Sequence, residues 1–158
     1  MKCFLLFVFW SVAYNSYVLK GLEDKAYFTA IQSATTSSVL SARQKALIFA
    51  KNTLATMVNG KVKNVTKGYI EHNSETGKSV DEFMTETRMT VGMLLQNVEI
   101  ADENVVQEKK GKYTVYITLK LKKDEVLQAL CKRLNENKET KGIFRKDVFT
   151  DLWDKENK

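Results

Sequence analysis

The clearest pattern along the chain is a row of small residues at helical spacing. Ala42, Ala46 and Ala50 recur every four residues, which places their side chains on one stripe of an α-helix. Larger apolar residues continue the stripe at positions 54, 57 and 58. We predict a helix over 39–58 that ends at the following Asn-Gly pair, because both residues tolerate a left-handed backbone. The small side chains would let this helix lie close to a flat partner, and a β-sheet is the obvious one.

Strands are expected on both sides of this helix. Aromatic and β-branched residues over 26–32 predict the first strand. A run of Ser, Ala and Thr over 33–38 follows, and it offers turn chemistry and helix-capping oxygens. After the helix, apolar residues among lysines over 61–71 predict an irregular second strand with a bulge near Gly68.

Alternation predicts a β-hairpin in the second half of the chain. Over 112–121 every second residue is apolar, and the other face carries lysine, threonine and Tyr116. A turn over 108–111 ends in glycine and connects this strand to one over 98–107, whose alternation is interrupted at 101–104. One dry face and one wet face are typical of an antiparallel sheet.

Three more helices complete the predicted order. Ser79 and Glu82 stand at the spacing of a capping box, and apolar residues at helical spacing follow them. Further helices are expected over 123–137 and 143–153. The order is strand, helix, strand, helix, hairpin, helix, helix. It predicts an α+β fold in which helices pack on one face of a mainly antiparallel sheet of about four strands, as a single domain over 25–153.

The first residues have the layout of a targeting segment. Met1-Lys2 precedes an apolar run over 3–10, and the small residues at 11–13 could form a cleavage site. The run is too short to span a bilayer, which takes roughly 20 apolar residues. We predict that residues 1–13 are a secretory signal or anchor segment. The alternative is a buried N-terminal strand or helix of the domain.

Composition indicates a globular chain with a basic surface. The 158 residues are 44% hydrophobic and 28% charged, and the formal net charge is +6. Lys61, Lys63 and Lys67 form a basic cluster, a feature that can meet nucleic acid or anionic lipid. We interpret this cluster as a charged sheet edge that resists pairing with another edge. One tyrosine on the wet face of the hairpin is too few for a base-stacking surface, so no nucleic-acid partner is expected.

No residue pattern indicates an enzyme. His72 is the only histidine and begins a polar loop over 72–77, with no nucleophile or orienting carboxylate defined beside it. Cys3 and Cys131 are far apart in the chain, which argues against a disulfide framework and against a cysteine-based metal site. We therefore predict no catalytic, cofactor-binding or metal-binding residues.

Several of these motifs resemble a bacterial envelope family. They are the strand that begins Tyr27-Phe28, the helix with Ala42-Arg43, the strand at 95–100 and the Gly-Lys-Tyr hairpin segment over 111–115. In this arrangement the chain is similar to the twenty-kilodalton surface lipoproteins, which are related to the N-terminal domain of flagellar assembly protein T. The similarity covers residues 25–130.

The resemblance implies an exported domain without enzymatic activity, in the periplasm or associated with the outer membrane. Its expected partners are an envelope protein or the membrane surface, and homo-oligomers are an option. Gln32 stands where the family usually has glycine, and no cysteine follows the apolar run, so acylation stays open. A periplasmic hydrolase of envelope material is the alternative function, and a basic nucleic-acid-binding domain is a more distant one.

Overall fold

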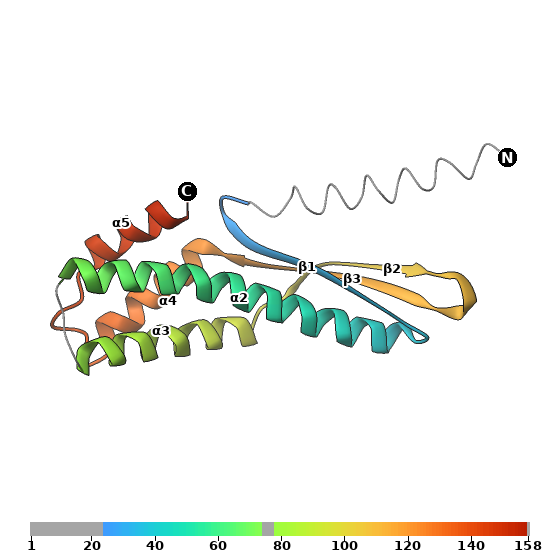
Figure 1. The fold of residues 1–158 in the computed structure, drawn as a ribbon, viewed down its shortest axis with the longest axis horizontal. Helices are drawn as coiled ribbons and strands as arrows, with labels where there is room; N and C mark the ends of the chain where they lie inside the picture. The colour runs from blue at the N-terminus through green and yellow to red at the C-terminus, as the bar shows by residue number, and fades with distance from the viewer. Residues whose placement is uncertain (1–23, 74–77, 158) are drawn as a thin grey trace.

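The protein is α+β, as predicted. A computed structural model describes residues 24–73 and 78–157. Figure 1 shows that α2 runs along the sheet and continues beyond it, to the place where α3, α4 and α5 gather. The elements in chain order are β1 (Tyr27–Thr36), α2 (Val39–Asn73), α3 (Lys78–Gln96), β2 (Ile100–Gln107), the short 3-10 helix η1 (Lys109–Gly111), β3 (Tyr113–Lys122), α4 (Lys123–Glu136) and α5 (Lys146–Glu156).

The three strands form one antiparallel sheet in the order β1-β3-β2. The central strand β3 pairs with all of β1 on one side. On the other side it pairs with β2, where the register shifts between Ile100 and Asp102. The described residues thus form three strands rather than the expected four or so, because the segment predicted as the second strand is helical.

The predicted strand over 61–71 is wrong, because helix α2 passes straight through it. The apolar stripe continues beyond the Asn-Gly pair, and Val62, Val65 and Tyr69 are all buried. The backbone at Gly60 is not left-handed, so the pair does not end the helix. Burial of the stripe outweighs the roughly 1 kcal/mol that an interior glycine costs a helix.

At the sheet end of α2 the buried stripe is made of alanines. Ala42, Ala46 and Ala50 are fully buried, and α2 packs against β1 and β3. The small side chains leave room for the apolar face of the sheet, as the alternation over 112–121 predicted. The buried apolar residues of that face are Val115, Ile117, Leu119 and Leu121 on β3 and Phe28 and Ala30 on β1.

At the helical end of α2 the buried stripe becomes aromatic. Tyr69 stacks on Phe83 of α3, with ring centroids 5.0 Å apart and planes 9° from parallel. Phe144 and Phe149 contact both of these rings, at centroid distances between 5.7 and 6.1 Å. Four aromatic rings from three helices and a loop therefore form the core where the sheet has ended.

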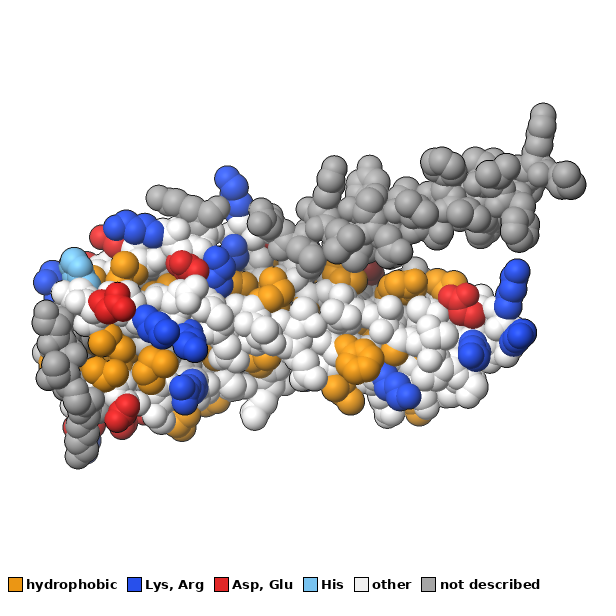
Figure 2. Space-filling view, viewed as in Figure 1, with side chains coloured by type: hydrophobic (Ala, Val, Ile, Leu, Met, Phe, Trp, Pro, Cys, Tyr) orange, Lys and Arg blue, Asp and Glu red, His pale blue; other side chains and the backbone are white. Residues whose placement is uncertain are grey.

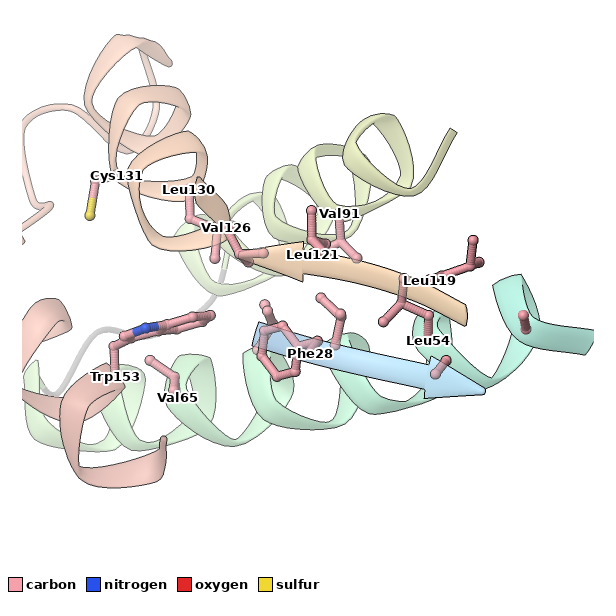
Figure 3. Packing of buried hydrophobic residues seen from close by; sticks show 14 of the residues in the cluster. Phe28, Leu54, Val65, Val91, Leu119, Leu121, Val126, Leu130, Cys131 and Trp153 are labelled. Atoms are coloured by element: carbon pink, nitrogen blue, oxygen red, sulfur yellow. The ribbon is translucent and has the colours of Figure 1, made fainter. Parts of the chain in front are cut away.

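Helix α5 closes this end of the molecule. The Tyr69 hydroxyl donates a hydrogen bond to the Ile143 carbonyl (3.1 Å) and accepts one from the Arg145 amide (2.7 Å), just before α5 begins. Trp153 of α5 points toward Phe28 of β1 (Figure 3), with ring centroids 6.3 Å apart. The aromatic residues of the last helix are therefore part of the core and not an exposed patch.

Other predicted elements are present in the structure with shifts at their ends. β1 continues to Thr36, so most of the predicted turn over 33–38 is strand. The helix predicted over 123–137 is confirmed as α4, and α5 begins at Lys146, three residues later than predicted. The predicted N-terminal signal or anchor segment and the side chain of Ser79 lie outside the described residues.

The predicted hairpin is confirmed, with one exception on its wet face. Lys110 and Gly111 form the tight tip with φ angles of 61° and 69°. Lys120 is exposed, but Thr114 on the same face is buried. The hydroxyls of Thr114 and Thr35 lie 2.7 Å apart across β1 and β3, so the loss of water is offset by a hydrogen bond within the sheet.

Candidate interaction surface

Strand β2 is an edge of the sheet, and almost all of it is exposed. Residues from Ala101 to Gln107 are exposed and Ile100 is half-buried. β2 pairs with β3 on one side, and no other described strand pairs with its second side. Within the described part of the chain, its outer N–H and C=O groups thus have no strand partner. This geometry allows another strand to be added to a sheet.

The two faces of β2 each show an apolar side chain. The register with β3 places Asn104 and Val106 on the face that points away from α2, and Glu103 and Val105 on the face toward it. Val105 is 44% exposed and Val106 is 38% exposed. A partner strand beside β2 would therefore cover a valine on either face.

The first turns of α2 lie beside β2. Arg43 donates hydrogen bonds to both carboxylate oxygens of Glu103, at 3.1 Å and 2.8 Å. Residues three and four apart share a helix face, so Leu40 and Leu47 lie on the same side of α2 as Arg43. Leu47 is half-buried against the core, whereas Leu40 is 62% exposed. An exposed leucine thus lies on the β2 side of the helix.

Charged residues lie toward both ends of this edge. Glu99, Asp102 and Glu103 stand at its beginning, and Lys110 and Lys112 stand in the hairpin tip that follows its end. Figure 2 shows basic side chains at the tip, at the right-hand end of the molecule. We call residues 99–112 the β2 edge. It is an exposed stripe with an acidic beginning and a mixed far end, where Glu108 precedes the lysines of the tip.

The other outer strand, β1, is covered more fully. Phe28 and Ala30 are buried on the face toward α2, and the side chain of Gln32 donates a hydrogen bond to the Thr53 hydroxyl of α2 (3.1 Å). These contacts hold β1 against the helix layer. The two outer strands thus differ in exposure, and β2 is the more accessible one.

A buried carboxylate joins α3 to α4. Glu86 is only 5% exposed. Its carboxylate accepts a hydrogen bond from Arg133 Nε at 2.5 Å and one from the Asn137 side chain at 2.8 Å. The bond from Arg133 is the main cause that lowers the pKa of the Glu86 carboxyl; burial opposes it, and the bond from Asn137 adds to it. Both bonds fasten one helix to the other, so we assign the cluster a structural role.

The residues considered for chemistry lie apart. His72 is exposed in the last turn of α2. Cys131 is buried with a free thiol and lines a groove of about 580 Å³ between α4 and α5. Burial is the main cause that raises the pKa of the Cys131 thiol, which keeps the sulfur protonated and a poor nucleophile. Among the described residues, no three His, Cys, Asp or Glu side chains are grouped so that they could hold a metal ion.

The interpretation of the lysine cluster as a sheet edge is wrong, because its residues lie on helix α2. The Lys61 ammonium donates a hydrogen bond to the Glu156 carbonyl (2.7 Å) and lies 3.4 Å from the carboxylate of that residue. Lys63 and Lys67 are exposed on the helix. The exposed edge of the sheet is instead β2. The sequence pattern predicted a strand there but not its position at the edge, and the signal for that position was the run of polar residues at 102–104.

Comparison with known proteins adds little. No family model matches the chain, and no curated protein matches it. Among solved structures, it is similar to the secreted protein HP1454 from Helicobacter pylori, with 23% identity and a TM-score of 0.33 over 71% of this chain and 36% of that one. So low a score carries no argument about fold or function. The resemblance to the surface lipoproteins therefore stays a prediction.

A membrane span needs a long and apolar helix. None of the helices in residues 24–73 and 78–157 is long and apolar enough to cross a bilayer. The long helix α2 has charged and polar residues along its length, and its apolar stripe faces the protein core.

Proposed function

We propose that the chain is an exported, envelope-associated protein without enzymatic activity, and that it works by binding a partner along the β2 edge. The observation that carries the proposal is the exposure of β2 from Ala101 to Gln107. Proteins commonly protect an edge of this length with proline, an inward-pointing charge or a covering element. This chain contains no proline. The first half of β2 has an inward-pointing charge, Glu103, which Arg43 binds, and a register shift between Ile100 and Asp102. The second half presents Val105 and Val106 to solvent.

Export is supported by the start of the sequence. A lysine precedes a short apolar run over 3–10, and small residues follow at 11–13. This is the layout of a secretory signal. The family that the chain resembles has the same location, which supports an envelope partner rather than a cytosolic one.

Absence of enzymatic activity is supported by the dispersal of the reactive side chains. His72 lies on α2 and Cys131 on α4, one exposed and the other buried. General acid–base or nucleophilic catalysis needs such groups within hydrogen-bond reach of one another. A binding function needs only the exposed edge.

Fractionation of the cells that produce the chain, combined with the intact mass of the native protein, tests the proposal. We expect the chain in the envelope fraction, with a mass that lacks the first residues or carries added lipid. A matched variant, Leu6→Arg, puts a charge into the apolar run and should leave the chain in the cytosol. A wild-type chain of full, unmodified mass in the cytosol would contradict the proposal.

A further inference from the structure

We infer that the solvent-facing side of helix α2 binds the surface of a lipid bilayer with anionic headgroups. We call this side the α2 outer face, and its exposed residues are Lys45, Ile48, Phe49, Asn52, Thr56, Lys63 and Lys67. The inference goes beyond the proposed function, because it concerns a surface other than the β2 edge. It takes from that proposal only the location of the chain in the envelope.

The α2 outer face forms one line along the helix. Its residues recur mostly at steps of three, four or seven positions, which keeps them on one side of a helix. Each residue adds about 1.5 Å to the length of an α-helix, so the line from Lys45 to Lys67 is about 33 Å long. Figure 1 shows that α2 is a single helix over this length. The face therefore offers a long, narrow contact to a flat partner.

The α2 outer face is positively charged, and no acidic residue of its own helix lies within it. No aspartate or glutamate occurs between Asp24 and Glu71. Glu71 follows Lys67 by one turn and marks the end of the face. The charge of the face is thus set by its three lysines.

Carboxylates of neighbouring elements approach α2 outside this face. Arg43 binds Glu103 of β2, and Lys61 binds Glu156 of α5. Neither basic residue belongs to the α2 outer face. Within residues 24–73 and 78–157, no carboxylate forms an ion pair with the three lysines of the face. These lysines are therefore available to an anionic partner.

The neighbouring helix α3 adds one charge of each sign beside the face. Arg88 lines a groove together with Lys63. Asp81 comes seven residues before Arg88 and so lies on the same side of α3. The two charges of α3 offset one another, and the excess of positive charge comes from α2.

Exposed apolar side chains stand among the lysines. Ile48 is 57% exposed and Phe49 is 48% exposed, and Lys45 lies one turn before both. Figure 2 shows an apolar group beside a basic side chain where α2 runs along the sheet in Figure 1. An anionic bilayer binds this combination, because its headgroups attract lysines and its acyl boundary accepts apolar side chains. A nucleic acid has anionic phosphates too, but it offers no apolar layer for Ile48.

Co-sedimentation of the purified full-length chain with lipid vesicles tests the inference. We expect binding to vesicles that contain phosphatidylglycerol, weakened by high salt, and much weaker binding to vesicles of phosphatidylcholine alone. The variant Lys45→Gln/Lys63→Gln/Lys67→Gln should bind the anionic vesicles about a hundredfold more weakly, because each lysine near such a surface contributes about fivefold. Phe49→Ala should bind about fivefold more weakly, since it removes apolar contact. The apolar run over 3–10 is present in every variant, so it cannot cause these differences.

The matched control is Lys132→Gln/Lys138→Gln/Lys141→Gln, which removes the same charge at exposed positions of α4 and the turn after it. It should bind the anionic vesicles as the wild type does. Equal binding of the wild type to both kinds of vesicle, no binding to either kind, or an equal loss in the control would overturn the inference. Tighter binding to single-stranded DNA than to the vesicles at the same phosphate concentration would also overturn it and indicate a nucleic-acid partner.

The vesicle assay and the cell fractionation can fail separately. The assay uses purified protein, so absence of vesicle binding would overturn this inference while a chain in the envelope fraction would still support the proposed function. All variants should keep the wild-type melting temperature, because the replaced side chains are exposed.

Discussion

The two ends of α2 bury the same stripe of the helix with opposite kinds of side chain. Over the sheet, the stripe consists of Ala42, Ala46 and Ala50, all fully buried. Beyond the sheet, it consists of larger residues that end in Tyr69, whose ring stacks on Phe83. The alanines let the helix approach a flat sheet, whereas a bundle of round helices leaves space that large rings fill. The size of the buried residue therefore indicates which kind of partner each half of α2 meets.

The largest effect on stability is expected from removing the Tyr69 ring at the helical end of α2. Tyr69→Ala should lower the free energy of unfolding by about 3–5 kcal/mol, because it leaves a cavity among Phe83, Phe144 and Phe149. Chemical denaturation of the purified chain measures the loss. Phe49→Ala on the sheet half of α2 is the matched control, since that ring is 48% exposed. Equal losses of stability in the two variants would contradict the claim that the Tyr69 ring fills the core at the helical end of α2.

Overfilling the sheet end should have the next largest effect. Ala46→Leu should cost about 1–3 kcal/mol of stability, because α2 would have to move away from β1 and β3 to accommodate the side chain. Lys45→Leu, which adds the same residue at the neighbouring exposed position, should change stability by less than about 0.5 kcal/mol. Denaturation curves that show no loss for Ala46→Leu would mean that the helix does not lie closely on the sheet.

The polar contact at the helical end predicts a pH dependence. The folded-state pKa of Glu86 is lowered, mainly by the Arg133 hydrogen bond, so ionised Glu86 stabilises the fold at pH values above its unfolded pKa. That contribution disappears as the pH falls through the lowered pKa of the folded state. Thermal melts of Glu86→Gln should therefore lose stability less steeply on acidification than those of the wild type. Parallel curves for the two proteins would show that Glu86 does not contribute in this way.

The smallest expected effect is a gain in stability from a substitution at Gly60, where the two halves of α2 meet. Gly60 lies inside the helix and has open space around the position of a Cβ atom. Gly60→Ala should raise stability by about 0.5–1 kcal/mol, because alanine favours the helix. Gly111→Ala is the contrasting control and should destabilise, since its φ of 69° is unfavourable for a side chain. A loss with Gly60→Ala in denaturation experiments would argue against a continuous helix.

Local periodicity predicted much of the fold. The alternation of β3 and the stripe of α4 were recognised because each depends on neighbours in the sequence. The second half of α2 was missed, although Val62, Val65 and Tyr69 continue the helical spacing. The Asn-Gly pair is locally typical of a helix end, but burial of the stripe decides the structure.

The functional surface was harder to predict. Strand β2 was expected, but its polar residues at 102–104 only hint at an edge, because the order of the strands is set by their pairing in the sheet. The same limit applies to Glu86, which is buried because Arg133 and Asn137 reach it from another helix. Both features depend on tertiary contacts between distant segments, and only the three-dimensional arrangement reveals them.

The most direct test of the account is photo-crosslinking in cells from the β2 edge. A photoreactive amino acid would replace Asn104 in one strain and Ile48 of α2 in another, and the cells would be fractionated after irradiation. We predict a crosslinked protein adduct from position 104 in the envelope fraction and none from position 48. Protein adducts from position 48 alone, or from neither position, would contradict the claim that this protein works through its exposed sheet edge.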